Sequence, residues 1–209
     1  MSSKTEQNTF KRICIYGGSS DSIAPVFVKA AADLGQILAQ EGIGVVFGGG
    51  KTGMMGAIAD AMRAEGAEVI GIIPELFNTP ALGHQRLTEL IVVDSMHVRK
   101  AKMAEMGEAF IALPGGFGTY EELFEILTWS QIGLHTKPVG VLNVEGYFDP
   151  LLDMIEHSRK NGFIYDEHRA LLLCADNAAE LLEKLRAYRT PDGLGRWVHR
   201  KGPEAHSNK

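Results

Sequence analysis

Residues 111–122 combine a turn that could hold an anion with two carboxylates that could act beside it. The stretch is Ile-Ala-Leu-Pro-Gly-Gly-Phe-Gly-Thr-Tyr-Glu-Glu, so an apolar run ends in a proline and three glycines before a helix predicted to begin at Thr119. Backbone N–H groups left free at such a strand-to-helix turn bind phosphate and other anions. Because Glu121 and Glu122 would repel an anion, they predict chemistry beside it.

Two adjacent cations, Arg99 and Lys100, fall in the first turn of the helix predicted after the fourth strand. The helix dipole disfavours positive charge there by roughly 0.3–1 kcal/mol per group. An anion at the same edge of the sheet would compensate both cations, which favours a place in the site. The alternative is that both are solvated surface charges. For His97, a packed imidazole agrees with the sequence as well as a catalytic one does.

Local sequence gives Glu122 a second interpretation. Thr119-Tyr120-Glu121-Glu122 fits the capping-box pattern, in which Glu122 would reach back to the Thr119 backbone N–H. This pattern alone predicts a cap as readily as a catalytic group. Thr128, on the same predicted helix, could face the site or bond a backbone carbonyl.

Three glycine turns are expected at the carboxyl ends of the strands, where ligands bind in parallel sheets. They are residues 17–20, 48–56 and 114–119. The first two contribute Gly18, Ser19, Gly49 and Gly50 as candidate substrate-binding residues.

The second turn contains Gly48-x-Gly50-x-x-Gly53, which matches the dinucleotide-binding fingerprint. That fingerprint usually follows the first strand of its unit, and here it follows the second strand of the chain. A P-loop ending in Lys51 would need glycine at Val45, so its spacing fails. The glycines could instead serve only a tight turn and close helix packing.

Short apolar segments alternate with longer segments of helical periodicity along the chain. The predicted strands are 12–16, 43–47, 68–73, 90–93, 109–113, 139–143 and 170–173, and the predicted helices are 25–40, 54–65, 95–108, 119–132, 149–160 and 177–188. Residues 77–86 are predicted to be a loop or a short irregular helix. The alternation predicts one α/β domain over residues 11–188, with a doubly wound, Rossmann-like parallel sheet of about seven strands. Residues 1–10 and 189–209 are predicted to be flexible tails.

Composition limits the classes of binding partner that are expected. The 209 residues carry a formal net charge of -5, which argues against a general nucleic-acid or anionic-membrane binder and favours a small-molecule partner. We find no secretory signal and no apolar run of membrane-spanning length, so a cytoplasmic protein is expected. Cys14 and Cys174 lie in or directly beside predicted strands without a CxxC or His cluster, so we expect buried, unpaired thiols and no metal.

The segments Ser95-Met96-His97-x-Arg99-Lys100 and Pro114-Gly115-Gly116-x-Gly118-Thr119-x-x-Glu122 together resemble the LOG ("lonely guy") family of cytokinin-activating phosphoribohydrolases. The similarity covers residues 11–188 and includes Tyr16-Gly17-Gly18-Ser19-Ser20 and Asn143-x-x-Gly146-Tyr147-Phe148. The resemblance implies hydrolysis of the N-glycosidic bond of cytokinin riboside 5'-monophosphates or AMP, giving free base and ribose 5-phosphate. It also implies a homodimer with the site near the interface. We expect no cofactor.

By the same resemblance Arg99 and Glu122 are the catalytic pair. The substrate-binding positions that it implies are Lys100, Gly116, Phe117, Gly118, Thr119, Tyr120, Glu121 and Thr128. Our hypothesis is that free N–H groups of residues 116–119 hold the 5'-phosphate, while Glu122 stabilises positive charge on the ribose and Arg99 orients Glu122. No acid for the departing base is assigned, although Glu121 could serve. Residues 77–86, which match the family least, lie where the base is expected.

Three other classes remain open on the sequence. A non-catalytic nucleotide-binding or carrier protein could use the same fold and turns. A dehydrogenase would rest on the glycine fingerprint alone. Related proteins are sometimes labelled lysine decarboxylases, which would need pyridoxal phosphate on a lysine, and no lysine here has a supporting context.

Overall fold

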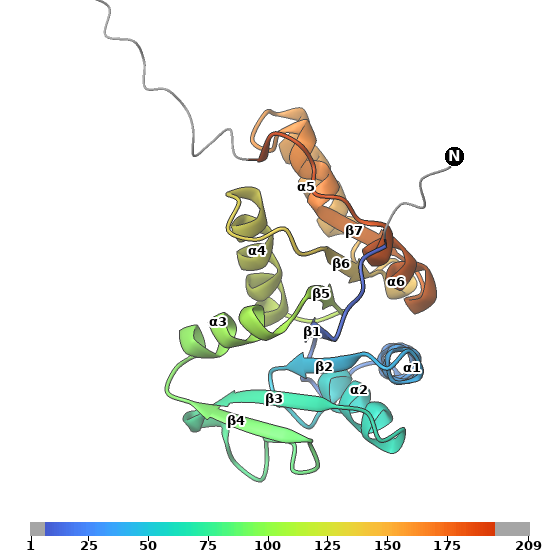
Figure 1. Ribbon diagram of the computed structural model, residues 1–209, viewed down its shortest axis with the longest axis vertical. Helices are drawn as coiled ribbons and strands as arrows, with labels where there is room; N and C mark the ends of the chain where they lie inside the picture. The colour runs from blue at the N-terminus through green and yellow to red at the C-terminus, as the bar shows by residue number, and fades with distance from the viewer. Residues whose placement is uncertain (1–6, 195–209) are drawn as a thin grey trace, which may run out of the picture.

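The computed structural model describes residues 7–194, which form a layered α/β molecule around a parallel sheet (Figure 1). Within these residues the sheet has seven strands in the order β4-β3-β2-β1-β5-β6-β7, and every neighbouring pair is parallel. The strands are β1 Arg12–Tyr16, β2 Gly44–Phe47, β3 Val69–Pro74, β4 Glu89–Val93, β5 Ala109–Ala112, β6 Val139–Leu142 and β7 Leu172–Ala175. Strand order reverses between β1 and β5, so their carboxyl ends form the crevice where ligands bind in such sheets.

Helices cover both faces of the sheet, as the doubly wound prediction requires (Figure 1). One face carries α1 Pro25–Gln40, α2 Gly53–Ala64 and α6 Ala178–Ala187, and the other carries α3 Met96–Met106, α4 Phe117–Gln131 and α5 Asp149–Lys160. Between residues 7 and 194 there are also three short 3₁₀ helices, η1 Glu75–Phe77, η2 Val144–Gly146 and η3 Asp166–Leu171. None of the helices in the described part of the chain is long and apolar enough to cross a membrane.

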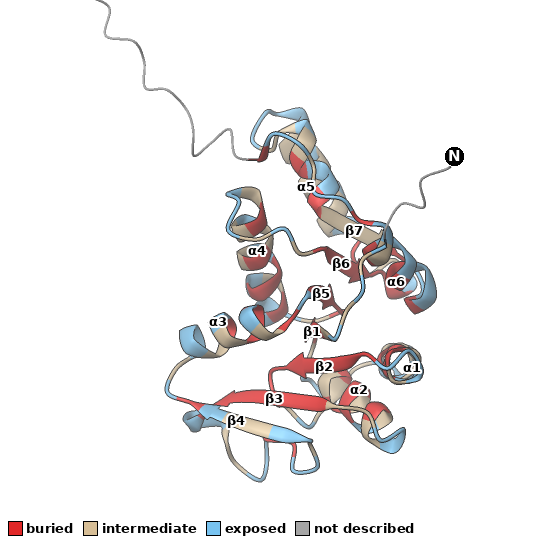
Figure 2. Cartoon of the chain, viewed as in Figure 1, coloured by how far each residue is buried: buried red, intermediate tan, exposed pale blue. Residues whose placement is uncertain are grey.

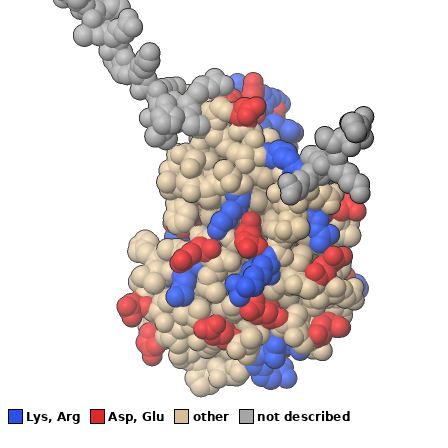
Figure 3. Space-filling model, viewed as in Figure 1, with Lys and Arg blue, Asp and Glu red and all other residues tan. Residues whose placement is uncertain are grey.

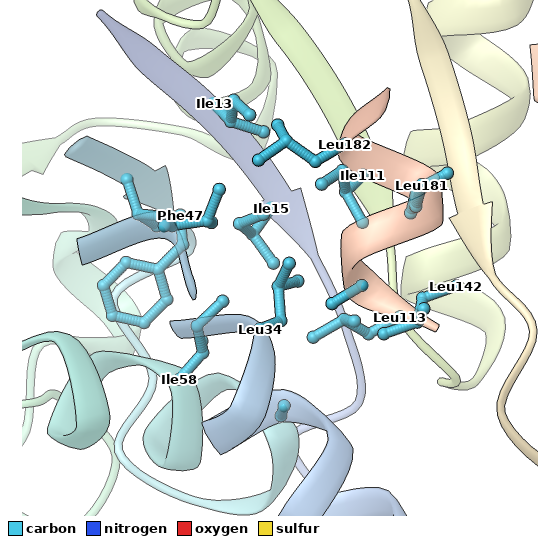
Figure 4. Packing of buried hydrophobic residues seen from close by; sticks show 14 of the residues in the cluster. Ile13, Ile15, Leu34, Phe47, Ile58, Ile111, Leu113, Leu142, Leu181 and Leu182 are labelled. Carbon is cyan, nitrogen blue, oxygen red and sulfur yellow. The ribbon is translucent and has the colours of Figure 1, made fainter. Parts of the chain in front are cut away.

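Strand β1 shows how one sequence serves two cores. Ile13 and Ile15 pack into the cluster under α1, α2 and α6 (Figure 4). Cys14 and Tyr16 belong to the cluster under α3 and α4. Successive strand residues point to opposite faces, so a strand with helices on both sides must be apolar throughout. Figure 2 shows the central strands buried, while the edge strand β4 is partly exposed.

The close packing of α1 on α2 depends on Gly35. A Cβ at that position would lie 2.9 Å from the Ile58 carbonyl oxygen, closer than van der Waals contact allows. On the same helix Leu34 is fully buried between the sheet and α2 (Figure 4). Truncation of such a leucine to alanine typically costs about 2–5 kcal/mol. This layer holds α2, and therefore the turn before it, firmly against the sheet.

The predicted elements are all present, and most of their bounds differ from the prediction by one or two residues. Helix α4 begins at Phe117 rather than Thr119, because Gly116 is already its N-cap. Strand β7 begins two residues later than predicted, because η3 extends to Leu171 and pairing with β6 starts at Leu172. Cys14 is buried and Cys174 is only half-buried because β7 is an edge strand; both are free thiols.

The predicted N-terminal tail is partly tied to the domain. The Asn8 backbone N–H donates to the Arg186 carbonyl at 2.9 Å, and the Asn8 side chain donates to the carbonyls of Leu185 and Tyr188. Residues 1–6 and 195–209 of the two predicted tails lie outside the described residues. On the face seen in Figure 3, acidic and basic side chains are interspersed rather than gathered in one field of a single sign.

Candidate active site

A cavity of about 720 Å³ lies at the carboxyl ends of the central strands. The turns after β1, β2 and β5 meet there, as predicted for the glycine turns. Of the predicted site residues, those that line the cavity are Gly18, Ser19, Gly50, Arg99, Gly116, Gly118, Thr119 and Glu122. Those that do not line it are Gly49, Lys100, Phe117, Tyr120, Glu121 and Thr128.

Backbone hydrogen bonds join the three turns into one unit. The Gly18 N–H donates to the Pro114 carbonyl at 3.0 Å, and the Met54 N–H donates to the Gly18 carbonyl at 2.9 Å. A Cβ at Gly115 would lie 2.1 Å from the Thr119 hydroxyl oxygen, so only glycine allows this approach. Gly115 therefore serves the close packing of this turn against the first turn of α4.

The N-terminus of α4 offers free backbone donors to the cavity. Gly116 is the N-cap and supplies no side-chain cap. The N–H groups of residues 116–119 have no acceptor among the described residues. Four such groups lie at the positive end of this 15-residue helix, which is where proteins commonly bind anions.

Glu122 forms a buried ion pair with Arg99, one of whose guanidinium nitrogens donates to Glu122 Oε1. Only 14% of the Arg99 side chain and 8% of the Glu122 side chain is exposed. Burial raises the pKa of Glu122 above its ordinary value, and the neighbouring Arg99 offsets part of that effect. The capping-box interpretation of Glu122 is wrong, because Thr119 is the third helical residue and not the N-cap.

Arg99 packs against the turn after β2 on its way to Glu122. A Cβ at Gly48 would lie 3.4 Å from three atoms of the Arg99 guanidinium group. The guanidinium therefore lies against the backbone of the turn after β2 while it reaches α4 from α3. Its place on α3 and its contacts with α4 and the turn after β2 thus fix the position of Arg99. The sequence predicted only that Arg99 lies at the same edge of the sheet as the turn before α4.

Lys100 pairs with carboxylates of α4 rather than facing the cavity. Its ammonium group contacts Glu121 Oε1 and lies 3.0 Å from Glu125 Oε1, with 8% of the side chain exposed. Arg99 and Lys100 are therefore compensated by three carboxylates of α4, and the argument that they require a bound anion does not hold. The interpretation of both as solvated surface charges is also wrong.

The other predicted site residues that lie outside the cavity differ in exposure and in their contacts. The Phe117 side chain is 94% exposed, and His97 is exposed as well. Thr128 donates to the Phe124 carbonyl at 2.7 Å, which is the backbone alternative foreseen for it. Gly49 is buried, and a Cβ there would lie 3.2 Å from Ile73.

Sequence reasoning did not identify the apolar side of the cavity or the tyrosine on its wall. The apolar lining residues are Ile23, Ala24, Phe27, Met54, Met55, Ile73, Phe77, Leu82 and Met96, together with Tyr147. Phe77 and Leu82 belong to the segment expected near the base, and Tyr147 belongs to the Asn-x-x-Gly-Tyr-Phe motif. The segment and the motif were both present in the sequence and could have indicated these residues. The convergence of Met54, Met55 and Met96 at the cavity depends on the tertiary fold.

The described residues at this cavity provide neither a metal-binding cluster nor a lysine for a Schiff base. Within the described residues no group of three or more His, Cys, Asp or Glu side chains is arranged to hold a metal ion. No lysine is among the described residues that line the cavity. A pyridoxal phosphate enzyme needs such a lysine for its internal Schiff base.

Comparison with known proteins agrees with this geometry. A family model described as "Possible lysine decarboxylase" matches residues 55–185. The chain is therefore a Rossmann-like protein of that broad family. The chain is 43% identical over 182 residues to cytokinin riboside 5'-monophosphate phosphoribohydrolase LOG2 of Arabidopsis thaliana, covering 87% of this chain and 85% of the relative. It is also 43% identical to LOG of Oryza sativa subsp. japonica, covering 87% and 75% of the two chains. The chain belongs to the LOG family.

Solved structures share the fold at lower identity. A molybdenum cofactor binding protein from Rippkaea orientalis has a TM-score of 0.65 at 21% identity, covering 86% of this chain and 97% of that one. The molybdenum cofactor carrier protein from Chlamydomonas reinhardtii has a TM-score of 0.64 at 21% identity, covering 86% and 100%. At this identity the likeness confirms the Rossmann-like fold and nothing about the ligand.

Proposed function

We propose that this protein hydrolyses the N-glycosidic bond of cytokinin riboside 5'-monophosphates or AMP, releasing the free base and ribose 5-phosphate. The observation that carries the proposal is the buried Arg99–Glu122 pair on the wall of a cavity that also receives the free N–H groups of α4. The names of the relatives support the same reaction. The chain uses no cofactor in this scheme.

The 5'-phosphate binds the N–H groups of residues 116–119 and so places the ribose beside Glu122. Cleavage of the C1'–N bond leaves positive charge on the ribose, which a nearby carboxylate stabilises. Water adds to C1', the base leaves with a proton, and ribose 5-phosphate results. Arg99 orients the carboxylate. Glu121 is not assigned as the acid for the base, because it contacts Lys100 outside the cavity lining.

Base release measured by chromatography tests the assignment. Glu122→Gln removes the charge while keeping the shape, and we expect turnover to fall by about 10²-fold or more. Glu125→Gln is the matched control, because Glu125 lies on the same helix and pairs with Lys100 instead. Its turnover should stay within a few-fold of wild type. Near-wild-type turnover in a folded Glu122→Gln protein would remove Glu122 from the mechanism.

The phosphate anchor has its own test. The nucleoside that lacks the 5'-phosphate should react far more slowly than the nucleotide, since it cannot use the N–H groups of α4. Equal rates for the two compounds would refute the anchor while leaving the Glu122 assignment intact.

The apolar wall suits a base that carries an apolar substituent. Phe77 and Leu82 line the cavity from the segment between β3 and β4. Burial of apolar surface contributes roughly 25 cal/mol per Å², so an isopentenyl group in contact with these side chains should improve binding over AMP. We expect Leu82→Ser to lower kcat/KM for the isopentenyl nucleotide more than for AMP. An equal loss for both nucleotides would place the substituent elsewhere.

A homodimer is the second part of the proposal. Apolar side chains of β4, α3 and α4 are between 36% and 47% exposed, namely Val92, Met96, Val98 and Phe124. Met96 also lines the cavity, so a second copy seated on this surface would lie next to the site. We expect a dimer mass in light scattering and a monomer for Val98→Asp. A monomeric wild type would refute the dimer.

We also propose a cytoplasmic location, which cell fractionation would test.

A non-catalytic nucleotide carrier of the same fold is the alternative. It would bind AMP without releasing adenine, so the same chromatographic assay separates the two functions. The hydrolase gives the buried Arg99–Glu122 pair on the cavity wall a role in the reaction, so the hydrolase is the first proposal.

A further inference from the structure

Tyr147 connects the segment after β6 to the anion-binding turn. Its ring lines the cavity, while its hydroxyl donates to the Gly115 carbonyl at 2.6 Å. The Tyr120 hydroxyl in turn donates to the Tyr147 oxygen at 3.1 Å. The two hydroxyls form a chain that begins on α4 and ends on the turn just before α4.

The hydrogen bond from Tyr147 to the Gly115 carbonyl also fixes the orientation of the neighbouring N–H group. The peptide unit between Gly115 and Gly116 is planar and trans, so its C=O and N–H groups point in opposite directions. A hydroxyl that holds the carbonyl therefore also sets the direction of the Gly116 N–H. That N–H is one of the free donors at the start of α4. Because glycines on both sides of this peptide permit many conformations, the orientation needs an outside constraint.

Hydrogen bonds and ring contacts hold the segment that carries Tyr147. The Asn143 side chain accepts a hydrogen bond from the buried Phe148 N–H at 2.7 Å and donates to Asp149 at 2.9 Å. The Tyr147 ring meets Phe27 and Phe148 edge to face, with centroids 5.8 and 5.2 Å apart. These contacts fix the ring, and the hydroxyl is then directed at Gly115.

Tyr120 completes the arrangement. Its hydrogen bond to Tyr147, together with burial, raises the pKa of Tyr120 to about 12. Tyr120 thus keeps its proton at neutral pH and remains a donor, which leaves the proton of Tyr147 for the Gly115 carbonyl. The direction of the whole chain is therefore fixed by the single acceptor at its end.

We propose that Tyr147 is a positioning residue for phosphate, which aims the Gly116 N–H by holding the Gly115 carbonyl, and that Tyr120 secures the Tyr147 hydroxyl. The proposal rests on the proposed function for the identity of the substrate phosphate. It concerns binding of the anion, and neither tyrosine takes part in bond cleavage.

The decisive variant is Tyr147→Phe, which keeps the ring and its edge contacts and removes the hydroxyl. Isothermal titration with inorganic phosphate and with ribose 5-phosphate measures anion binding without turnover. We expect Kd to rise about tenfold for both, as for the loss of a donor aimed at a charged group. KM for the nucleotide should rise similarly while kcat stays within about threefold, as for a loss of uniform binding.

Two comparisons separate positioning from a merely structural role. The rate with the nucleoside, which lacks the phosphate, should be the same for wild type and Tyr147→Phe. Tyr120→Phe leaves the Gly115 carbonyl bonded and should raise Kd for phosphate in the same direction but less. Unchanged Kd and KM in Tyr147→Phe would overturn the proposal, as would a fall in kcat with KM unchanged.

The same experiments distinguish failure of this inference from failure of the proposed function. If wild type binds phosphate, releases no base, and Tyr147→Phe weakens phosphate binding, the hydrolase assignment fails and the positioning role stands. If wild type releases base and Tyr147→Phe behaves like wild type with every ligand, the hydrolase assignment stands and the positioning role fails.

Discussion

The buried pair between Arg99 and Glu122 predicts a stability change that depends on pH. Arg99→Met removes the cation while keeping an unbranched side chain of similar reach. Glu122 would then be a carboxylate with 8% of its side chain exposed and no cation beside it. Breaking a buried pair by removing one partner typically costs about 3–5 kcal/mol, unless the remaining group changes its protonation state.

The sign of the pH dependence follows from the pKa of Glu122. Burial raises this pKa above 4.5, and Arg99 lowers it in part. A raised folded-state pKa means that the group's contribution to stability is full below the unfolded-chain value and is lost as pH rises through the folded-state value. Without Arg99 the folded-state pKa rises further, so the loss becomes larger and extends to higher pH.

Urea unfolding at a series of pH values measures this effect. We expect the free energy of unfolding of Arg99→Met to lie about 3–5 kcal/mol below wild type at pH 8 and to approach wild type near pH 5. The double variant Arg99→Met/Glu122→Gln has no buried charge to neutralise, so its deficit should be smaller at pH 8 and nearly independent of pH. A deficit in Arg99→Met that is the same at pH 5 and pH 8 would refute this reasoning.

Further predictions concern the turn, a helix end and the thiols. Gly115→Ala places a Cβ 2.1 Å from the Thr119 hydroxyl and should cost about 1–3 kcal/mol in urea unfolding, whereas Gly116→Ala meets nothing within 4 Å and should cost far less; equal costs would contradict the close approach. Lys137→Met leaves the carbonyls at the end of α3 without their ammonium donor and should lower stability by about 1–3 kcal/mol, as read from the melting temperature. Cys14 is buried, and burial raises the pKa of its thiol, so iodoacetamide should label it only in denaturant; rapid labelling of the native protein would show that β1 opens.

The local features of this protein could be predicted from its sequence. The fold class follows from short apolar segments alternating with helical ones, because a strand covered on both faces must be apolar throughout. Helices 25–40 and 149–160 were predicted with their observed bounds, since Pro near the first turn marks each start. The glycine turn before α4 was also predictable, because glycines and a helix start are adjacent in the chain.

The partners of the charged side chains were decided only by the tertiary structure. The same Thr119-x-x-Glu122 pattern could have been a cap, and the start of α4 at Phe117 excluded that by moving Thr119 inside the helix. Glu122 lies 23 residues from Arg99 and Lys100 lies 21 from Glu121, so no local pattern links them. Their pairing depends on how α3 and α4 pack on one face of the sheet, and in a low-dielectric interior a charge must find a partner among whatever side chains that packing brings within reach.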